Sequence, residues 1–389
     1  MISGQATYEH LKGIRERRVD SILSSATTIE PSFTISKIIS IMLENDSYDV
    51  FYINKNSVFT INARDLLATR DVSKMKVDAL LRKIQPLSKN DTIEKAATLM
   101  THYRMRSAPV VDNNEIIGVV RAKNIVELLA QQNLKWITSN TILTPDPITI
   151  SKKEHLAKAR SVMITKRIDH LPIIQDSKVS HVLTSMHMLQ LITPGQRIGS
   201  DQKGLNQLRR LESPVGNIGS SRIPQCRTND SLSTVIESML KTDTTCCLIT
   251  LWDNLHGIIT YKDLLNLLET KIPSEVPLYI MGLPEDMSNA EIVRTKFQKI
   301  IANLTKVYPE VEEARASIKT IHGPVKERQH FEVTLRVITP YKTYSYTEID
   351  WDLSKVFDAL GRRIIRNLAN RSKKRWKMSV RKIDKNQIF

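Results

Sequence analysis

The sequence has few cysteines and no long hydrophobic run, and both shortages limit what kind of protein it is. Of its 389 residues only Cys226, Cys246 and Cys247 are cysteines, too few for a disulfide framework and without metal-ligand spacing. No uncharged apolar stretch approaches the roughly 18 residues of a membrane span. Residues 1–18 lack the apolar core of a secretory signal. We therefore expect a cytoplasmic protein without a membrane partner, with Cys246 and Cys247 in a buried strand.

Short motifs that mark common catalytic sites are also missing. The sequence contains no P-loop, no Gly-x-Gly-x-x-Gly after a strand, no His-Glu-x-x-His and no nucleophile elbow. Its nine histidines are scattered, and no pair of carboxylates is singled out by its spacing. We therefore expect a binding protein and not an enzyme, with no catalytic residue, no metal site and no required cofactor.

Basic residues are plentiful and are concentrated at one end. The net charge is +16, and apolar residues make up 41% of the chain, enough for a packed core. Residues 361–389 contain eleven Lys or Arg and one Asp, a net charge of +10, which leaves +6 for the other 360 residues. Such a basic end indicates a polyanionic partner. The alternative is a solvated tail that aids solubility.

A repeat accounts for most of the chain. Segments with helical periodicity lead to four methionines, Met42, Met100, Met163 and Met239. An apolar strand is expected nine residues after each methionine, followed by a second strand and a helix, and an extended segment precedes each first helix. Because so small a unit cannot bury both faces of its sheet, the four units should form two pairs. The predicted units span residues 14–72, 73–132, 136–193 and 213–271, with a loop or extra helix at 194–212.

These repeats resemble the cystathionine-β-synthase (CBS) domain, whose paired form is called a Bateman module. The most specific signature is the junction Gly-h-h-Thr/Ser-x-x-Asp, complete in the fourth repeat as Gly257, Thr260 and Asp263. The resemblance implies that Asp263 binds ribose hydroxyls and Thr260 contacts phosphate, so that AMP, ADP or ATP would be a regulatory ligand. Amide donors at a helix N-terminus favour such an anion. An N-cap role for Thr260 and Asp263 is an equally open alternative.

The other three junctions keep only part of this signature. Each retains one of the three signature residues. The first repeat keeps Asp65 but has Phe59 and Asn62 at the glycine and threonine positions. The second keeps Gly118 but has Arg121 and Asn124 at the other two positions, and the third keeps Thr184 but has His181 and His187. Asp65 is a weaker nucleotide candidate, and Arg121 could pair directly with a phosphate. For the remaining positions the pattern favours helix caps, and for His181 and His187 it favours surface or cap roles over metal binding.

The pattern changes after Lys271. Residues 272–277 read as a linker. We expect a strand at Leu278–Met281 and a helix capped by Ser288 with Glu291. Strands are then expected at 314–321, 331–337 and 341–349, and a long helix from near Trp351. The predicted fold class is thus α/β repeats followed by an α+β domain of order β-α-β-β-β-α at residues 276–389.

This last domain is similar to the ribosome hibernation promoting factor, or ribosome-associated inhibitor, family over residues 276–378. The closest stretch is a hairpin that leads into a helix with Asp352, Leu360 and Ile364. The resemblance implies docking on the RNA of the small ribosomal subunit, where the domain would exclude mRNA and tRNA. Trp376 would stack on a base or, equally well, cover the domain edge. The candidate RNA contacts are Arg362, Arg363, Arg366, Arg371, Lys373, Lys374, Arg375, Trp376 and Lys377.

Two functions remain open. The first is a ribosome-binding silencing factor whose CBS repeats sense adenine nucleotides or form a homodimer that bridges two small subunits. The second is an adenine-nucleotide-sensing regulator of transcription or of a partner enzyme. The absence of a helix-turn-helix and the +10 end favour the first.

Overall fold

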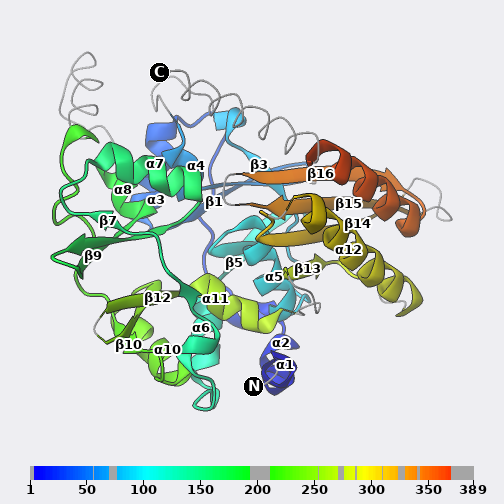
Figure 1. Ribbon diagram of the computed structural model, residues 1–389. Helices are drawn as coiled ribbons and strands as arrows, with labels where there is room; N and C mark the ends of the chain where they lie inside the picture. Colours follow the sequence, from blue (N-terminus) through cyan, green and yellow to red (C-terminus); the bar gives the residue numbers. More distant parts are fainter. Residues whose placement is uncertain are drawn as a thin grey trace, which may run out of the picture. The chain divides into compact units, whose positions relative to one another are not determined.

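The computed structural model describes residues 4–55, 57–69, 77–192, 211–252, 254–269, 276–284, 287–308, 310–322, 329–339 and 342–368 (Figure 1). The chain divides into two compact units, Met1–Glu269 and Thr270–Phe389. Both mix helices with strands, which confirms the mixed α/β class. No helix in the described part of the chain is long and apolar enough to cross a membrane.

The first unit repeats one order of elements: helix, strand, strand, helix. Before the repeats come α1 (Gly4–His10), α2 (Lys12–Arg15) and the 3-10 helix η1 (Val19–Ile22). The first repeat contains α3 (Ile35–Glu44), β1 (Asp49–Asn54), β2 (Ser57–Asn62) and α4 (Ala63–Leu67). The second contains η2 (Val77–Ala79), β3 (Arg82–Ile84), α5 (Ile93–Tyr103), β4 (Ser107–Asp112), β5 (Glu115–Arg121) and α6 (Ala122–Ala130).

The same order occurs twice more. The third repeat contains η3 (Ser139–Thr141), β6 (Thr144–Pro145), β7 (Ile150–Ser151), α7 (Leu156–Lys166), β8 (His170–Gln175), β9 (Lys178–Thr184) and α8 (Ser185–Ile192). The fourth contains β10 (Gln225–Arg227), α10 (Leu232–Lys241), β11 (Cys246–Leu251), β12 (Asn254–Thr260), α11 (Tyr261–Leu265) and η4 (Asn266–Leu268). Cys246 and Cys247 lie buried in β11, as predicted. Most of the predicted connector, residues 194–212, lies outside the described residues.

Local chemistry explains where these elements begin and turn. The side chains of Thr34, Thr92 and Ser231 each accept a hydrogen bond from an amide three residues later, which caps the first helix of their repeat. Asn113 and Asn114 both have positive φ in the two-residue turn between β4 and β5. Asparagine tolerates this conformation, and its twist suits an antiparallel hairpin.

The extended segments ahead of the first helices pair partly within their own repeat, as β7 does with β8 and β10 with β11, and partly with the other repeat of the pair. β3 pairs with β2 of the first repeat, and Ser24 pairs in return with Val119 of β5. In the other half, β6 pairs with β12, and Ser220 pairs with Val182 of β9. The first and second repeats therefore exchange strands, and so do the third and fourth. This reciprocal pairing gives the two predicted pairs a backbone hydrogen-bonded connection.

Helices join the two pairs to each other. α4 packs against α7 and α8, and α6 packs against α10 and α11. Figure 1 accordingly shows α3, α4, α7 and α8 in one group and α5, α6, α10 and α11 in another. One hydrophobic core joins the first and third repeats, with Ile39 and Leu66 of the first in the same cluster as Leu171 and Met188 of the third. All four repeats thus surround a common centre.

The second unit is a four-stranded sheet with helices on one face. It contains β13 (Leu278–Met281), α12 (Met287–Val307), β14 (Glu313–His322), β15 (Gln329–Ile338) and β16 (Thr343–Asp350), and residues 353–368 are helical. The strands lie in sequence order, with β13 parallel to β14 and the other pairs antiparallel. A parallel pair needs a crossover connection, which α12 supplies. Alternate residues of β15 pack against α12 and against the last helix.

Two predicted features of this unit, the start of α12 and the end of the last helix, lie at the limits of the described residues. The structure describes α12 from Met287, one residue before the predicted cap Ser288, whose side chain lies outside the described part of the chain. Helix ends are the least certain feature of a sequence pattern. The part of the predicted last helix beyond Leu368 lies outside the described residues.

Candidate functional site

Residues from one position of every repeat meet where the repeats come together. Six residues after the four aligned methionines stand Tyr48, Arg106, Asp169 and Thr245, and the next residues are Asp49, Ser107, His170 and Cys246. These residues begin, or directly precede, the first strand of each hairpin, β1, β4, β8 and β11. Because strand starts from all four repeats converge, polar side chains here can interact across repeat boundaries.

Asp169 connects the third repeat with the first. It accepts hydrogen bonds from the Tyr48 hydroxyl (2.6 Å) and from the Ser185 hydroxyl (2.6 Å). Its other oxygen lies 3.2 Å from Nη1 of Arg64, and both side chains are largely buried. Burial alone would raise the pKa of Asp169, but the charges of Arg64 and Arg106 and these hydrogen bonds hold it well below its usual value. Asp169 is therefore an ionised carboxylate at neutral pH.

Two further contacts join the repeats within each pair. Asp49 accepts hydrogen bonds from the backbone amides of Arg106 (2.8 Å) and Ser107 (2.9 Å), which joins the first repeat to the second. His170 Nε2 lies 2.7 Å from the Thr245 hydroxyl, which joins the third to the fourth. Burial lowers the pKa of His170 to about 3, so this imidazole is neutral.

A cavity of about 200 Å³ opens beside these residues. That volume is smaller than the roughly 300–1,000 Å³ of pockets that enclose a whole small ligand, so it suits the end of one. All four repeats contribute to its lining, with Asp49 from the first, Arg106 and Arg121 from the second, Met186 from the third and Tyr261 from the fourth.

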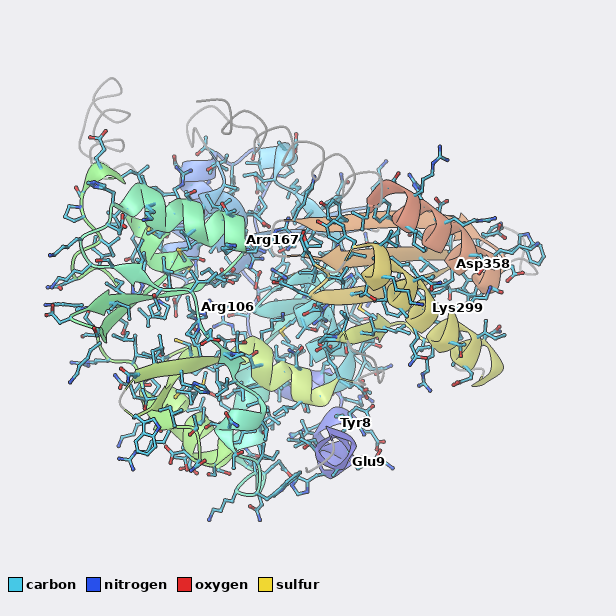
Figure 2. All side chains as sticks on the ribbon, viewed as in Figure 1. Tyr8, Glu9, Arg106, Arg167, Lys299 and Asp358 are labelled. Atoms are coloured by element: carbon cyan, nitrogen blue, oxygen red, sulfur yellow. The ribbon has the colours of Figure 1, made fainter. Side chains whose placement is uncertain are left out.

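Arg106 is a positive group of this cavity that forms no ion pair in the described structure, although its charge acts on Asp169. Its guanidinium carbon lies 4.2 Å from the centre of the Tyr48 ring. Its Nη2 atom is buried and has no hydrogen-bond acceptor among the described residues. A buried donor without an acceptor is costly unless a ligand or water supplies one. Figure 2 shows Arg106 between the two groups of helices of the first unit.

Other charged groups stand at the rim. Lys123 Nζ lies 2.7 Å from the Asp243 carboxylate, and both side chains are exposed. This pair joins α6 of the second repeat to the turn after α10 of the fourth. Arg121 also lines the cavity, and its Nη2 atom donates a hydrogen bond to the backbone oxygen of Ser25 at 3.4 Å. Among the nucleotide residues predicted from the sequence, Arg121 lines this cavity.

The predicted residues of the fourth repeat lie elsewhere and interact with one another. Asp263 accepts hydrogen bonds from the Thr260 amide (2.8 Å) and the Thr260 hydroxyl (2.7 Å), which is a capping box at the start of α11. Burial raises the pKa of Asp263. A Cβ on Gly257 would lie 2.8 Å from Leu143, next to the exchanged strand β6. This geometry agrees with the cap alternative, and the glycine makes room for strand exchange.

Asp65 and His187 also act locally. The Asp65 carboxylate lies 3.8 Å from Nη2 of Arg82 in the exchanged strand β3. His187 Nδ1 lies 2.9 Å from the Thr184 hydroxyl at the start of α8, in agreement with the predicted cap role. No group of three or more potential metal ligands occurs in the part of the chain that the structure describes.

The predicted RNA contacts are only partly described. Arg362 and Arg366 are exposed on the last helix. Arg363 is also exposed and forms an ion pair with Glu348 of β16. The remaining contacts lie outside the described residues: Arg371, Lys373, Lys374, Arg375, Trp376 and Lys377.

The residues that line the central cavity were missed in the sequence, with the exception of Arg121. The signal was present, because Arg106 and Asp49 hold fixed offsets from the aligned methionines. It was not recognised because the four repeats carry different residue types there.

Comparison with known proteins identifies the repeats. The model of the CBS domain matches residues 77–131, 140–193 and 215–270. The chain therefore contains tandem CBS domains, as predicted; these matches cover the second, third and fourth of the four predicted repeats. A crystal structure from Methanocaldococcus jannaschii, described as a proposed archaeal homolog of g-AMPK, is similar with a TM-score of 0.57 at 19% identity. The similarity covers 64% of this chain and 99% of that one, and it shows that the fold is shared.

Two uncharacterized proteins of the same organism are similar in sequence. One is 24% identical over 334 residues, which cover 82% of this chain and 77% of that protein. Because the first unit ends at Glu269, this match includes part of the second unit. The other is 26% identical over 143 residues, 36% of this chain and 47% of that protein.

Proposed function

We propose that the protein is a regulator that senses an adenine nucleotide through its tandem CBS domains. The observation that carries this proposal is Arg106, a half-buried residue that lines a cavity bounded by all four repeats and whose buried Nη2 atom has no acceptor among the described residues. A phosphate oxygen is an acceptor of the right charge for it. A ligand that touches several repeats at once can favour one arrangement of them over another, which is the requirement for regulation.

Loss of the Arg106 charge should weaken nucleotide binding. We expect the variant Arg106→Gln to bind AMP about 10- to 100-fold more weakly than the wild type, because a charge-assisted hydrogen bond contributes about 1.5–3 kcal/mol. Isothermal titration calorimetry with AMP, ADP and ATP measures this effect. Arg222→Gln, at an exposed arginine of the same unit, is the matched control and should bind like the wild type.

This titration distinguishes a wrong location of the nucleotide site from a wrong function. Equal affinity in Arg106→Gln and wild type would mean that the nucleotide binds elsewhere, for example beside Asp263, Thr260 and Gly257 or beside Asp65. No binding of any of the three nucleotides by the wild type would contradict the sensing function itself.

A second candidate function is docking on the RNA of the small ribosomal subunit. It is supported by the net charge of +10 over residues 361–389 and by the exposed Arg362 and Arg366 on the last helix. A homodimer formed through the CBS repeats would then join two subunits. The two functions are compatible, because a nucleotide in the first unit could control what the second unit binds.

Reversal of two exposed charges tests this docking. Arg362→Glu with Arg366→Glu should abolish co-sedimentation with small ribosomal subunits, because each lost cation removes a counterion-releasing contact with phosphate. Wild-type binding should weaken steeply with added salt. The matched control, Lys299→Glu with Lys306→Glu, makes the same charge change at exposed positions of α12, where Figure 2 labels Lys299. Unchanged sedimentation of the arginine variant would place the contact elsewhere or reject it.

A further inference from the structure

We propose that Asp49 and Arg106 together bind one terminal phosphate of the ligand, and that one proton is taken up from solvent as this phosphate binds. The inference rests on the proposed nucleotide site. It adds which chemical form of the phosphate the site selects, and it predicts that ligand sensing depends on pH.

Asp49 uses one of its two carboxylate oxygens inside the protein. Oδ2 accepts three hydrogen bonds, from the amides of Arg106 and Ser107 and from the Ser107 hydroxyl (3.1 Å). Oδ1 is buried and has no hydrogen-bond partner among the described residues. The residue is 2% exposed and lines the cavity. Its free oxygen is an acceptor when Asp49 is ionised and carries a donor when Asp49 is protonated.

Asp49 and Arg106 thus line the same cavity, and each has one buried polar atom without a partner among the described residues. A ligand group that satisfies both must offer an acceptor to Arg106 and must share a proton with Asp49. A terminal phosphate does both, because its second pKa is about 6 and it carries either P–O⁻ or P–OH near neutral pH. Two unprotonated oxygens, one from each group, would repel each other. One proton between them replaces this repulsion with a hydrogen bond, and no covalent bond of the ligand changes.

The surroundings of Asp49 bring the pKa of its carboxyl group close to neutral pH. Burial is the largest influence and raises the pKa of Asp49 to about 7, although the hydrogen bonds from Arg106 and Ser107 and the charge of Arg82 act to lower it. Arg64 of α4 also interacts with it by charge. A phosphate that arrives with negative charge should favour the protonated form further. The other charged groups that line the cavity are Asp46, Asp243, Arg121 and Lys123.

The sign of the pH effect follows from this balance. Below pH 7 Asp49 already holds its proton, so binding needs none from solvent. Above pH 7 a proton must be taken up, so the dissociation constant for AMP should rise up to about tenfold per pH unit between pH 7 and 9. AMP itself is fully ionised in this range and contributes little to the change.

The test is calorimetric titration of the full chain with AMP at pH 6 to 9. At pH 8, titrations in two buffers with different ionisation enthalpies count the protons taken up, and we expect about one per AMP bound by the wild type. Asp49→Asn keeps an acceptor for the amides of Arg106 and Ser107 and presents a permanent donor to the phosphate. This variant should take up no proton and should bind AMP with little pH dependence. Asp176→Asn, at an exposed acid of the same unit that does not line the cavity, is the control and should keep the wild-type slope.

Two results would overturn the proposal, and they are distinguishable. Absence of proton uptake by the wild type at pH 8 would reject proton-linked binding while the nucleotide site at Arg106 stands, and this measurement does not depend on how any variant folds. A pH slope in Asp49→Asn equal to that of the wild type would assign the proton to another group. If the wild type binds none of AMP, ADP and ATP even at pH 6, both this inference and the proposed function are wrong.

Discussion

Asparagine in place of Asp169 is expected to lower the free energy of unfolding of the first unit by about 3–5 kcal/mol, a typical effect of removing one partner from a buried ion pair. The substitution removes the charge that neutralises Arg64, whose side chain is 10% exposed. It also replaces an ionised acceptor for the Tyr48 and Ser185 hydroxyls with a neutral one. Because Tyr48 and Arg64 belong to the first repeat and Asp169 to the third, the loss should loosen the joint between the two pairs.

Urea denaturation followed by circular dichroism measures this loss. Asp176→Asn is the matched control, since Asp176 is exposed in the turn between β8 and β9, where asparagine tolerates the positive φ. The control should lie within about 0.5 kcal/mol of the wild type. A loss below about 1 kcal/mol in Asp169→Asn would show that the buried pair contributes little to holding the repeats together.

Alanine in place of Phe357 should destabilise the second unit by about 3–5 kcal/mol, the usual cost of emptying a buried aromatic position. Phe357 is fully buried, and its ring centre lies 6.4 Å from that of Phe297 in α12. The cavity left between the last helix and α12 would remove packing on which the helical face of the sheet depends.

This variant also tests whether the two units are energetically separate. Differential scanning calorimetry should show a lower melting temperature for the transition of the second unit, while AMP binding by the first unit stays unchanged. Ile349→Ala, at a position that is 56% exposed on β16, is the control and should have little effect. A single transition in which nucleotide binding is lost together with the second unit would mean that the units unfold as one.

The elements of the fold could be predicted from the sequence because apolar periodicity determines them. The strand at Leu278–Met281 has the predicted limits, and α10 covers the helical segment that was predicted to lead to Met239. Strand exchange could not be predicted in this way. Residues such as Thr144 and Pro145 of β6 form a very short strand, and no local pattern indicates that it pairs with β12 more than a hundred positions further on.

The candidate site could be predicted only in part from the sequence, for a physical reason. The signature at Gly257, Thr260 and Asp263 is complete within one repeat, and the structure shows there a helix cap and the close approach of β6. The cavity at Arg106 depends instead on residues that approach one another only when four repeats assemble. A polar residue at the start of a strand has no periodic signal of its own, so its partners must be known before its role is visible.

Duplication of one unit would by itself produce a centre with nearly equivalent corners, where a ligand could settle in several orientations. In this protein the four repeats place different residues at the centre, Tyr48, Arg106, Asp169 and Thr245, so the side chains do not share the approximate symmetry of the backbone. Asp169 and Thr245 are engaged by neighbouring repeats, whereas Arg106 keeps a donor for an incoming molecule. The side chains thereby make the centre of a pseudosymmetric backbone asymmetric, and an asymmetric centre can distinguish one end of a ligand from the other.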